Sequence, residues 1–383
     1  MPQDALVIGG GIGGLAVALA LAQRGVAVTV AEQAAQIAEV GAGIQISPNG
    51  AAVLKALGVL GAVAATGAVA AGKVRLRDYA AGAEVAKIDL THRADQRFLF
   101  VHRADLVRVL LEAVVHAGVD VQLGCRAAKF EPNVPNRVDF ETGERLSTEL
   151  VVFADGLHSV GRFAINGVSD AQFTGQVAWR ALVPAQNPIS EVSVYMGPGR
   201  HMVCYPLRGG QLMNVVAVEE RETWAQEGWH HRDDPENLRR AFATFGGQAR
   251  HLLDKVEEVH LWGLFRHPVA ENWFSGSSVL LGDAAHPTLP FLAQGANMAL
   301  EDAWALAHSV CVGGGLKAYQ NKRRARTKRI VATATGNARK YHLRHGPLRW
   351  AAHRALSIGS RLAPGLMVGQ FDWLYRYDVT SEV

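Results

Sequence analysis

The chain has 383 residues, of which 49% are hydrophobic and 19% are charged, and its formal net charge is +4. This composition indicates a soluble globular chain long enough for two domains, and the small charge argues against nucleic-acid binding. The three cysteines, Cys125, Cys204 and Cys311, are scattered and show no metal-binding spacing, so we expect a reducing, cytoplasmic setting and no metal site.

The first strongly apolar stretch runs from Ala5 to Ala22. It has no basic leader, contains five glycines and continues directly into polar residues, which argues against a signal peptide or a transmembrane segment. The pattern instead predicts a strand at residues 5–8, a glycine-rich turn, a helix at 15–24 and a strand at 26–31.

A nucleotide-binding motif occupies the turn of this βαβ unit. Gly9, Gly11 and Gly14 form G-x-G-x-x-G, in which the glycines serve the tight turn, the approach of a pyrophosphate and helix–strand packing. Glu32 ends the second strand, where a carboxylate can accept hydrogen bonds from ribose hydroxyls. Its charge would repel a ribose 2′-phosphate, but the motif does not distinguish FAD from NAD.

The next helix is predicted to open at Arg103 and to run to about His116. Arg103 could reach a phosphate or the edge of a flavin; the alternative is a surface ion pair with Asp105.

Two aspartates follow predicted strands. A strand at 149–154 ends at Asp155, and a strand at 279–281 ends at Gly282-Asp283. Open α/β sheets bind ligands at the carboxyl ends of their strands, so both carboxylates are placed to hold a polar ligand. An ordinary cap is the alternative for Asp283. A later helix is predicted to begin at about Gly295, where free N–H groups favour a negatively charged partner.

Alternating apolar and polar residues occupy the middle of the chain. Strands are expected at residues 177–183, 191–196, 201–207 and 211–218, with two more between 76 and 90. They predict a separate antiparallel sheet. Residues 233–253 are expected to be helical, and a strand at 259–265 is expected to return to the first domain.

The end of the chain is strongly basic, with no acidic residue between Lys317 and Asp372. We favour long C-terminal helices with solvated basic faces; contact with an anionic surface is the alternative.

These motifs together resemble the single-component, FAD-dependent aromatic hydroxylases, which are flavoprotein monooxygenases. The residues that carry the resemblance are the glycine motif with Glu32, Arg103 in Arg-x-Asp-Leu, Asp155-Gly156 with Ser159 and Arg162, and Gly282-Asp283 before His286-Pro287. The hydroxylases of 3-hydroxybenzoate and salicylate are the most similar members. The resemblance implies an α/β fold with a Rossmann-like FAD-binding domain, an interleaved antiparallel-sheet substrate domain and C-terminal helices.

The implied domains are discontinuous. The FAD-binding domain would comprise residues 1–72, 97–168 and 265–345, the substrate domain 73–96 and 169–264, and a C-terminal helical segment 346–383.

The resemblance also assigns cofactor contacts. Gly9, Gly11 and Gly14 would face the FAD pyrophosphate, Glu32 the adenosine ribose, Arg103 and Asp283 the ribityl–pyrophosphate region, and Asp155 both FAD and the passage of the nicotinamide cofactor. The N–H groups of Gly295, Ala296 and Asn297 would stabilise the negative charge of the reduced flavin.

The implied substrate site centres on a base. His201 and Tyr205 match a His-x-x-x-Tyr-Pro pattern and Gln294 an Ala-Gln-Gly turn, and in 3-hydroxybenzoate 6-hydroxylases these residues sit over the substrate. Because a phenol has a pKa of ~10 and a histidine ~6.5, proton transfer to His201 is uphill unless the site stabilises the phenolate. Arg180 is the candidate for the substrate carboxylate, and Pro287, Leu289 and Phe291 are expected to exclude water.

We therefore expect an FAD enzyme that hydroxylates a phenolic aromatic carboxylate with NADH or NADPH and O2 through a flavin hydroperoxide, 3-hydroxybenzoate ranking ahead of salicylate. Gln45 and Phe291 stand where relatives acting on 6-hydroxynicotinate have histidines, which argues against an aza-aromatic substrate. The alternatives are an FAD monooxygenase of a larger natural product and a flavin-binding regulatory protein. A homodimer is the assembly we consider.

Overall fold

The computed structural model describes residues 1–37, 42–90, 97–132, 136–168, 170–185, 190–221, 231–363, 365 and 369–381. Gly41, in the glycine-rich stretch that precedes Gly43, and residues 91–96 of the expected substrate domain lie outside this part.

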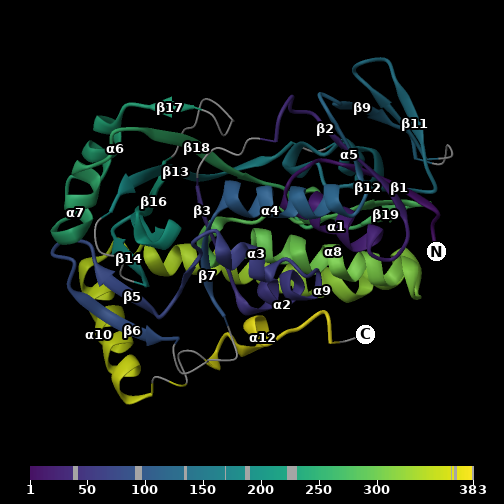
Figure 1. Cartoon of the computed structure of the whole chain (residues 1–383). Coiled ribbons are helices and arrows are strands. Elements are labelled where there is room, and N and C mark those ends of the chain that lie inside the picture. Colours follow the sequence, from purple (N-terminus) through teal and green to yellow (C-terminus); the bar gives the residue numbers. More distant parts are fainter. Residues whose placement is uncertain are drawn as a thin grey trace.

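A six-stranded sheet organises the first domain (Figure 1). Its strands, in spatial order, are β19 (Phe274–Ser275), β20 (Ser278–Leu280), β12 (Leu150–Phe153), β1 (Asp4–Ile8), β2 (Ala27–Glu32) and β8 (Asp120–Leu123). All neighbours pair in parallel except β19 and β20. All four residues of β12 are buried, as expected for a parallel strand covered on both faces. The predicted βαβ unit and α/β fold class are confirmed.

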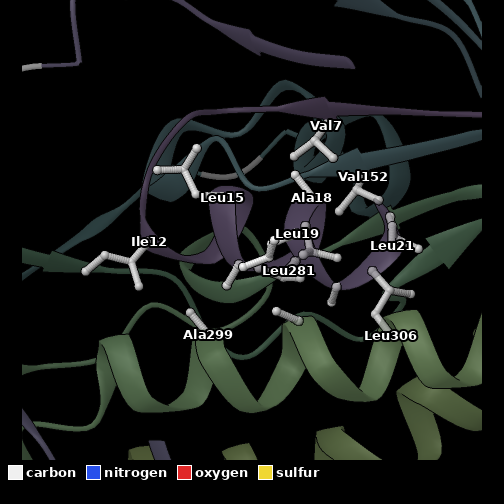
Figure 2. Close-up of a cluster of buried hydrophobic side chains, with 14 of the residues drawn as sticks. Val7, Ile12, Leu15, Ala18, Leu19, Leu21, Val152, Leu281, Ala299 and Leu306 are labelled. Carbon is white, nitrogen blue, oxygen red and sulfur yellow. The ribbon is translucent and has the colours of Figure 1, made fainter. Parts of the chain in front are cut away.

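Helix α1 (Ile12–Ala22) packs between this sheet and α8 (Gly295–Cys311), which begins where the sequence predicts (Figure 2). Val7 and Val152 point from the sheet toward Leu15 and Ala18 of α1. A Cβ at Gly13 would lie 2.7 Å from Cδ2 of Leu281 and 3.2 Å from Cβ of Ala299, so the two helices approach closely because this residue has no side chain. Helix α4 (Arg103–His116) also packs on α1.

A small antiparallel sheet covers the other face. It consists of β9 (Ala127–Phe130), β10 (Arg137–Phe140) and β11 (Arg145–Ser147), and α5 (Val160–Asn166) lies against it. Successive residues of a strand point to opposite faces, so Phe153 points away from α1, and its ring lies 4.9 Å from that of Phe130.

The second domain contains an eight-stranded sheet. In spatial order its strands are β17 (Arg232–Asp233), β18 (Val259–Arg266), β13 (Gln172–Pro184), β16 (Leu212–Glu220), β15 (Arg200–Leu207), β14 (Glu191–Gly197), β5 (Lys73–Asp78) and β6 (Glu84–Asp89). Only the β14–β5 pair is parallel. Every strand predicted for this region forms.

Strand β18, after which the chain returns to the first domain, pairs with β13 and β17 inside the eight-stranded sheet. Its alternating side chains explain this, because Leu261 packs in the cluster beneath α6 (Pro235–Ala241) and α7 (Gly247–Asp254), while Trp262 packs on the opposite face.

Shorter elements connect the two domains. Strands β3 (Gly43–Ile46), β7 (Leu99–His102) and β4 (Val69–Ala70) form a three-stranded sheet, and α2 (Pro48–Ala56) and α3 (Leu60–Ala65) follow β3. Helix α9 (Gly315–Tyr341) lies beside α8, α10 (Gly346–Leu362) stands against β6, and α12 (Asp372–Tyr375) is near the end of the chain (Figure 1). None of the described helices combines the length and apolar character needed to cross a bilayer.

The basic C-terminal run is partly buried, so the expectation of solvated faces is wrong for two of its arginines. Arg323 is fully buried and pairs with Glu301 at 2.5 Å and Asp302 at 2.7 Å. Arg326 donates to both oxygens of Glu301, each at 2.8 Å, and to the carbonyl of Leu374. Both acids belong to α8, which precedes the basic run in sequence. The run therefore needs no acidic residues of its own to pair these two arginines.

Replacing Glu301 by glutamine is expected to destabilise the fold by about 3–5 kcal/mol, because it leaves Arg323 buried without its nearest charge partner. Urea unfolding measures this loss. The matched control is Glu112→Gln, which breaks the exposed pair with Arg108 and is expected to cost about 0.5 kcal/mol or less. A similarly small loss for both variants would contradict the prediction.

Candidate active site

Four neighbouring parallel strands end at the residues expected to bind a cofactor. Strands β20, β12, β1 and β2 are adjacent in the sheet. They are followed by Asp283, Asp155 and Gly9, and β2 ends at Glu32. Since the carboxyl ends of parallel strands lie at one edge of a sheet, these residues lie together along the edge where such sheets bind ligands, which is called the nucleotide groove below.

The glycine turn leaves room for a ligand at one position only. A Cβ at Gly9 would lie 2.6 Å from the carbonyl oxygen of Ala154, and one at Gly14 would lie 1.9 Å from the carbonyl oxygen of Gly9. Both glycines are therefore required by the fold, and Gly9 also has φ +105°. A Cβ at Gly11 would meet nothing within 4 Å. The space over Gly11 is where a pyrophosphate can approach the backbone.

The carboxylate of Glu32 lies beside this turn. Its Oε2 accepts a hydrogen bond from the backbone N–H of Gly10 at 2.6 Å, and its Oε1 accepts one from Ala34 at 2.8 Å. These bonds hold the carboxylate at the position expected to face a ribose.

The two aspartates of the groove differ in their partners. Oδ2 of Asp155 accepts from the backbone N–H of Val160 at 2.9 Å, while Oδ1 has no hydrogen-bond partner among the described residues. Burial raises the pKa of Asp155 to about 6. Asp283 is exposed, but the protein atoms around its carboxylate partly desolvate it and so raise its pKa. The positive charges of His286 and then Arg103 act against this rise.

Arg103 thus lies within electrostatic reach of Asp283, at the start of α4. Asp105, the alternative partner considered for Arg103, accepts from Nε and Nη2 of Arg208, each at 3.0 Å.

The loop that carries Asp283 is held by Arg162. The buried guanidinium of Arg162 donates to the carbonyls of Ala284 at 3.0 Å, Ala285 at 3.2 Å and Pro268 at 2.7 Å. Arg162 therefore fixes the Asp283 loop relative to α5. The segment from Asp155 to Arg162 thus positions both aspartates, Asp155 through the N–H of Val160 and Asp283 through Arg162.

The start of α8 is tied to the turn between β3 and α2. The amide of Gln294 accepts from Asn49 at 3.1 Å and donates to the Ser47 hydroxyl at 3.0 Å. Asn297 accepts from the backbone N–H of Ser47 and donates to the carbonyl of Gln45, each at 3.0 Å. The Gln294 amide is thus engaged with Ser47 and Asn49. Any cofactor contact from Gly295, Ala296 or Asn297 would come from their backbone N–H groups.

His201 and Tyr205 lie on the face of the eight-stranded sheet opposite the α6 and α7 cluster. His201 is buried, with its ring centre 5.4 Å from that of Phe291. Tyr205 lies four residues along β15 on the same face, 5.1 Å from the Phe100 ring. A Cβ on Gly43 would lie 2.6 Å from the Tyr205 ring, so this tyrosine packs directly on β3.

Arg180 lies between these two residues on the sheet. It is opposite Val216, which is opposite Val203, the residue midway between His201 and Tyr205. Its guanidinium lies 4.4 Å from the centre of the Trp262 ring. Burial raises the pKa of Tyr205 well above its ordinary value, and the positive charge of Arg180 acts against this shift.

The loop after Asp283 closes over this face. Leu289 and Phe291 are buried with Ala178, Val218, Trp262 and Leu264 of the sheet. Pro287 is buried at the start of the same loop. His201, Tyr205, Arg180, Leu289 and Phe291 are therefore brought together by the fold.

Two polar residues at this face were missed by sequence reasoning. Nδ1 of His201 and Nε2 of His342 are 2.6 Å apart, and Nδ1 of His342 is 3.0 Å from Oε1 of Glu220. His342 is 141 residues from His201 and follows the basic helix α9, so no local pattern marks it.

The nucleotide groove and the facing sheet define a flavin-dependent class of enzyme. The family model described as FAD binding domain matches residues 3–334, and the chain belongs to this family. It is an FAD-dependent aromatic hydroxylase, as the motifs predicted.

The relatives agree with this class. The chain is 36% identical to the 3-amino-4-hydroxybenzoate 2-monooxygenase of Streptomyces cremeus, over 89% of this chain and 88% of that protein. It is 35% identical to the 3-hydroxybenzoate 6-hydroxylase of Polaromonas naphthalenivorans (strain CJ2), over 98% and 96%. Klebsiella pneumoniae HpxO complexed with FAD and uric acid superposes with a TM-score of 0.83 at 26% identity, covering 95% of each chain.

Proposed function

We propose that this enzyme hydroxylates a benzoate that carries a phenolic hydroxyl, using FAD, O2 and NADH or NADPH. The observation that carries the proposal is the shared position of His201, Tyr205 and Arg180 on one sheet face, covered by Leu289 and Phe291. A base, a hydrogen-bond donor and a cation are the groups that a phenolic carboxylate requires.

The groove residues fit FAD. The open space over Gly11 suits its pyrophosphate, the Glu32 carboxylate its ribose, and the region of Arg103, Asp155 and Asp283 the chain between pyrophosphate and ring. Bound FAD would supply electrons from the nicotinamide cofactor and activate O2. We assign residues 1–72, 97–168 and 265–345 to the FAD-binding domain, 73–96 and 169–264 to the substrate domain, and 346–383 to a C-terminal segment.

The chain's own residues would prepare the substrate. Burial lowers the pKa of His201 well below its ordinary value, so its imidazole is neutral at pH 7 and can accept the phenolic proton. Tyr205, with its raised pKa, stays protonated and can donate to the phenolate oxygen. Arg180 would pair with the carboxylate, and Leu289 and Phe291 exclude water. We assign Gln294 to holding the Ser47–Asn49 turn beside the ring.

The names of the relatives narrow the substrate. One names a benzoate with an amino group at C3 and oxygen entering at C2, the other a benzoate with a hydroxyl at C3 and oxygen entering at C6. Both carbons adjoin the carboxylate-bearing carbon and are ortho or para to the C3 donor. We therefore propose 3-hydroxybenzoate as the leading substrate and 3-amino-4-hydroxybenzoate as the second candidate, ahead of salicylate.

A substrate panel tests this proposal. NAD(P)H oxidation is followed with 3-hydroxybenzoate, 3-amino-4-hydroxybenzoate, salicylate and benzoate, while hydroxylated product and hydrogen peroxide are both measured. We expect stoichiometric product from a benzoate with a C3 donor and none from benzoate. Product only from a larger aromatic compound, or no stimulated oxidation at all, would favour the natural-product or regulatory alternative.

We also propose a cytoplasmic homodimer. The three cysteines are free thiols, which fits a reducing compartment. On α10, the apolar residues Leu348, Ala351, Ala355, Ile358 and Leu362 follow the 3–4 spacing typical of paired helices, and all are exposed. Leu348 is 56%, Ile358 55% and Leu362 80% exposed. An apolar stripe so exposed to water is unusual in a monomer and marks an interaction surface.

The double substitution Leu348→Glu and Ile358→Glu is expected to convert the dimer to a monomer, because it places charges in the apolar stripe of α10. Light scattering after gel filtration measures the mass. Val312→Glu, at a 69% exposed site outside α10, is the control and is expected to leave the mass unchanged. An unchanged mass for the double variant, or a monomeric wild type, would contradict dimerisation through this helix.

A further inference from the structure

A chain of three side chains leads from the substrate face of the sheet to the protein surface. His201 on β15 contacts His342 at 2.6 Å, and His342 contacts Glu220 at 3.0 Å. His201 and His342 are buried, whereas the Glu220 side chain is 30% exposed. Glu220 lines a surface pocket of about 600 Å³ together with Arg221, Arg266 and Leu289. The chain therefore ends in contact with water.

The hydrogen bonds fix which nitrogens carry protons. A carboxylate only accepts, so Nδ1 of His342 donates to Glu220 and Nε2 of His342 is the acceptor. Nδ1 of His201 therefore donates to Nε2 of His342. This leaves Nε2 of His201 with a free lone pair, and it makes no hydrogen bond within the described part of the chain. Nε2 is the atom that can take a proton from a substrate.

A positive charge held on His201 alone would be costly. Burial, and then the neighbouring His342, lower the pKa of His201 well below the ordinary value. Burial also lowers the pKa of His342, but the hydrogen bond and charge of Glu220 oppose that shift. Protonation is thus less unfavourable at His342 than at His201, because within the described part of the chain His342 contacts a carboxylate and His201 does not.

Other ionisable groups surround the chain. They are Tyr341 at the end of α9, Arg200 and Tyr205 on β15, Glu219 beside Glu220 on β16, and Arg344 in the segment after α9. Arg344 pairs with Glu220 at 2.5 Å, and Arg200 pairs with Glu219 at 3.2 Å. The two arginines disfavour a cation on His342, so Glu220 is the group that offsets them.

We propose that His342 and Glu220 form a proton relay that removes the phenolic proton of the substrate from His201 to solvent. The substrate O–H bond breaks as a new N–H bond forms at Nε2 of His201, and the oxygen keeps the electron pair. The proton on Nδ1 of His201 passes to Nε2 of His342, and the proton on Nδ1 of His342 passes to Glu220 and then to water. The relay rests on the proposed function, because the proton comes from a phenolic substrate.

The experiment compares the FAD-loaded wild type with His342→Gln and Glu220→Gln. Glutamine at 342 can still hydrogen-bond but cannot carry a proton, and glutamine at 220 keeps an acceptor oxygen without the charge. His353→Gln, a substitution of a partly buried histidine on α10, is the matched control. The first readout is the rate at which the phenolate absorbance of bound 3-hydroxybenzoate appears on the oxidised enzyme after a pH jump, recorded by stopped flow without nicotinamide cofactor. The second is kcat for hydroxylation against pH.

We expect both relay variants to slow the ionisation of the bound phenol at least about tenfold near pH 7, because the proton must then leave His201 without the relay. Their kcat at pH 7 should fall at least about tenfold and recover partly as pH rises, with substrate affinity nearly unchanged. His353→Gln should behave as the wild type. A wild-type rate of phenol ionisation in both relay variants, or a loss of kcat that is equal at every pH, would overturn the relay. Failure of the wild type to bind or hydroxylate any benzoate would instead overturn the proposed function, and the relay with it.

Discussion

Replacing His201 by glutamine is expected to lower kcat for hydroxylation by about 10²–10⁴-fold, because the variant loses the base that converts the bound phenol to the more electron-rich phenolate. The flavin groove is formed by other residues, so FAD should remain bound. Product formation by chromatography, together with NAD(P)H oxidation and peroxide release, measures the effect. We expect the variant to release hydrogen peroxide in place of most of the hydroxylated product.

The lowered pKa of His201 predicts how kcat depends on pH. A histidine whose pKa is lowered stays neutral to lower pH than an ordinary histidine, so it remains able to accept a proton below pH ~6.5. The acid limb of wild-type kcat should therefore lie below this pH, and it should be absent from His201→Gln. A His201→Gln variant with wild-type kcat and coupling would exclude this residue as the base and favour a substrate without a phenolic proton.

Replacing Gly11 by alanine is expected to weaken FAD binding by at least about 100-fold, roughly 2.7 kcal/mol. Gly11 has φ −77° and ψ −175°, which alanine adopts readily, and its new methyl group would meet no protein atom within 4 Å. The fold should be intact, so the loss would come from a methyl group in the space of the pyrophosphate. Titration of apoprotein with FAD, followed by flavin fluorescence, measures the affinity.

Two other glycines show why Gly11 is the informative position. Gly14→Ala would place a Cβ 1.9 Å from the carbonyl oxygen of Gly9 and would disturb the fold itself. Gly61→Ala serves as the control. Its methyl group also meets open space, but Gly61 lies in α3 and not in the glycine motif. FAD affinity that is equal in wild type, Gly11→Ala and Gly61→Ala would exclude the groove as the pyrophosphate site.

Sequence reasoning worked where the signal is local. The strand–glycine–helix–strand order near the N-terminus specifies the Rossmann unit, because buried parallel strands are continuously apolar and the motif glycines are required by contacts such as that of Gly14 with Gly9. Placement of Asp155 and Asp283 at strand ends followed from the same pattern. Alternation along β15 put His201 and Tyr205 on one face.

It failed where partners are distant in sequence. The contact of His342 with His201 joins the residue that follows α9 to β15, and no pattern near either residue predicts it. Arg323 belongs to a run that looks solvent-exposed until α8 supplies Glu301 and Asp302. The sequence likewise gives no sign that the amide of Gln294 contacts Ser47 and Asn49, which lie about 245 residues earlier in the chain. Each of these contacts depends on tertiary packing rather than on local periodicity.

A crystal structure of the enzyme with FAD and 3-hydroxybenzoate tests the placement of both ligands most directly. We expect the FAD pyrophosphate over Gly11, its ribose at Glu32, and the phenolic oxygen within hydrogen-bond distance of Nε2 of His201. FAD bound away from the ends of β20, β12, β1 and β2, or a phenolic oxygen beyond the reach of His201, would contradict the proposed site.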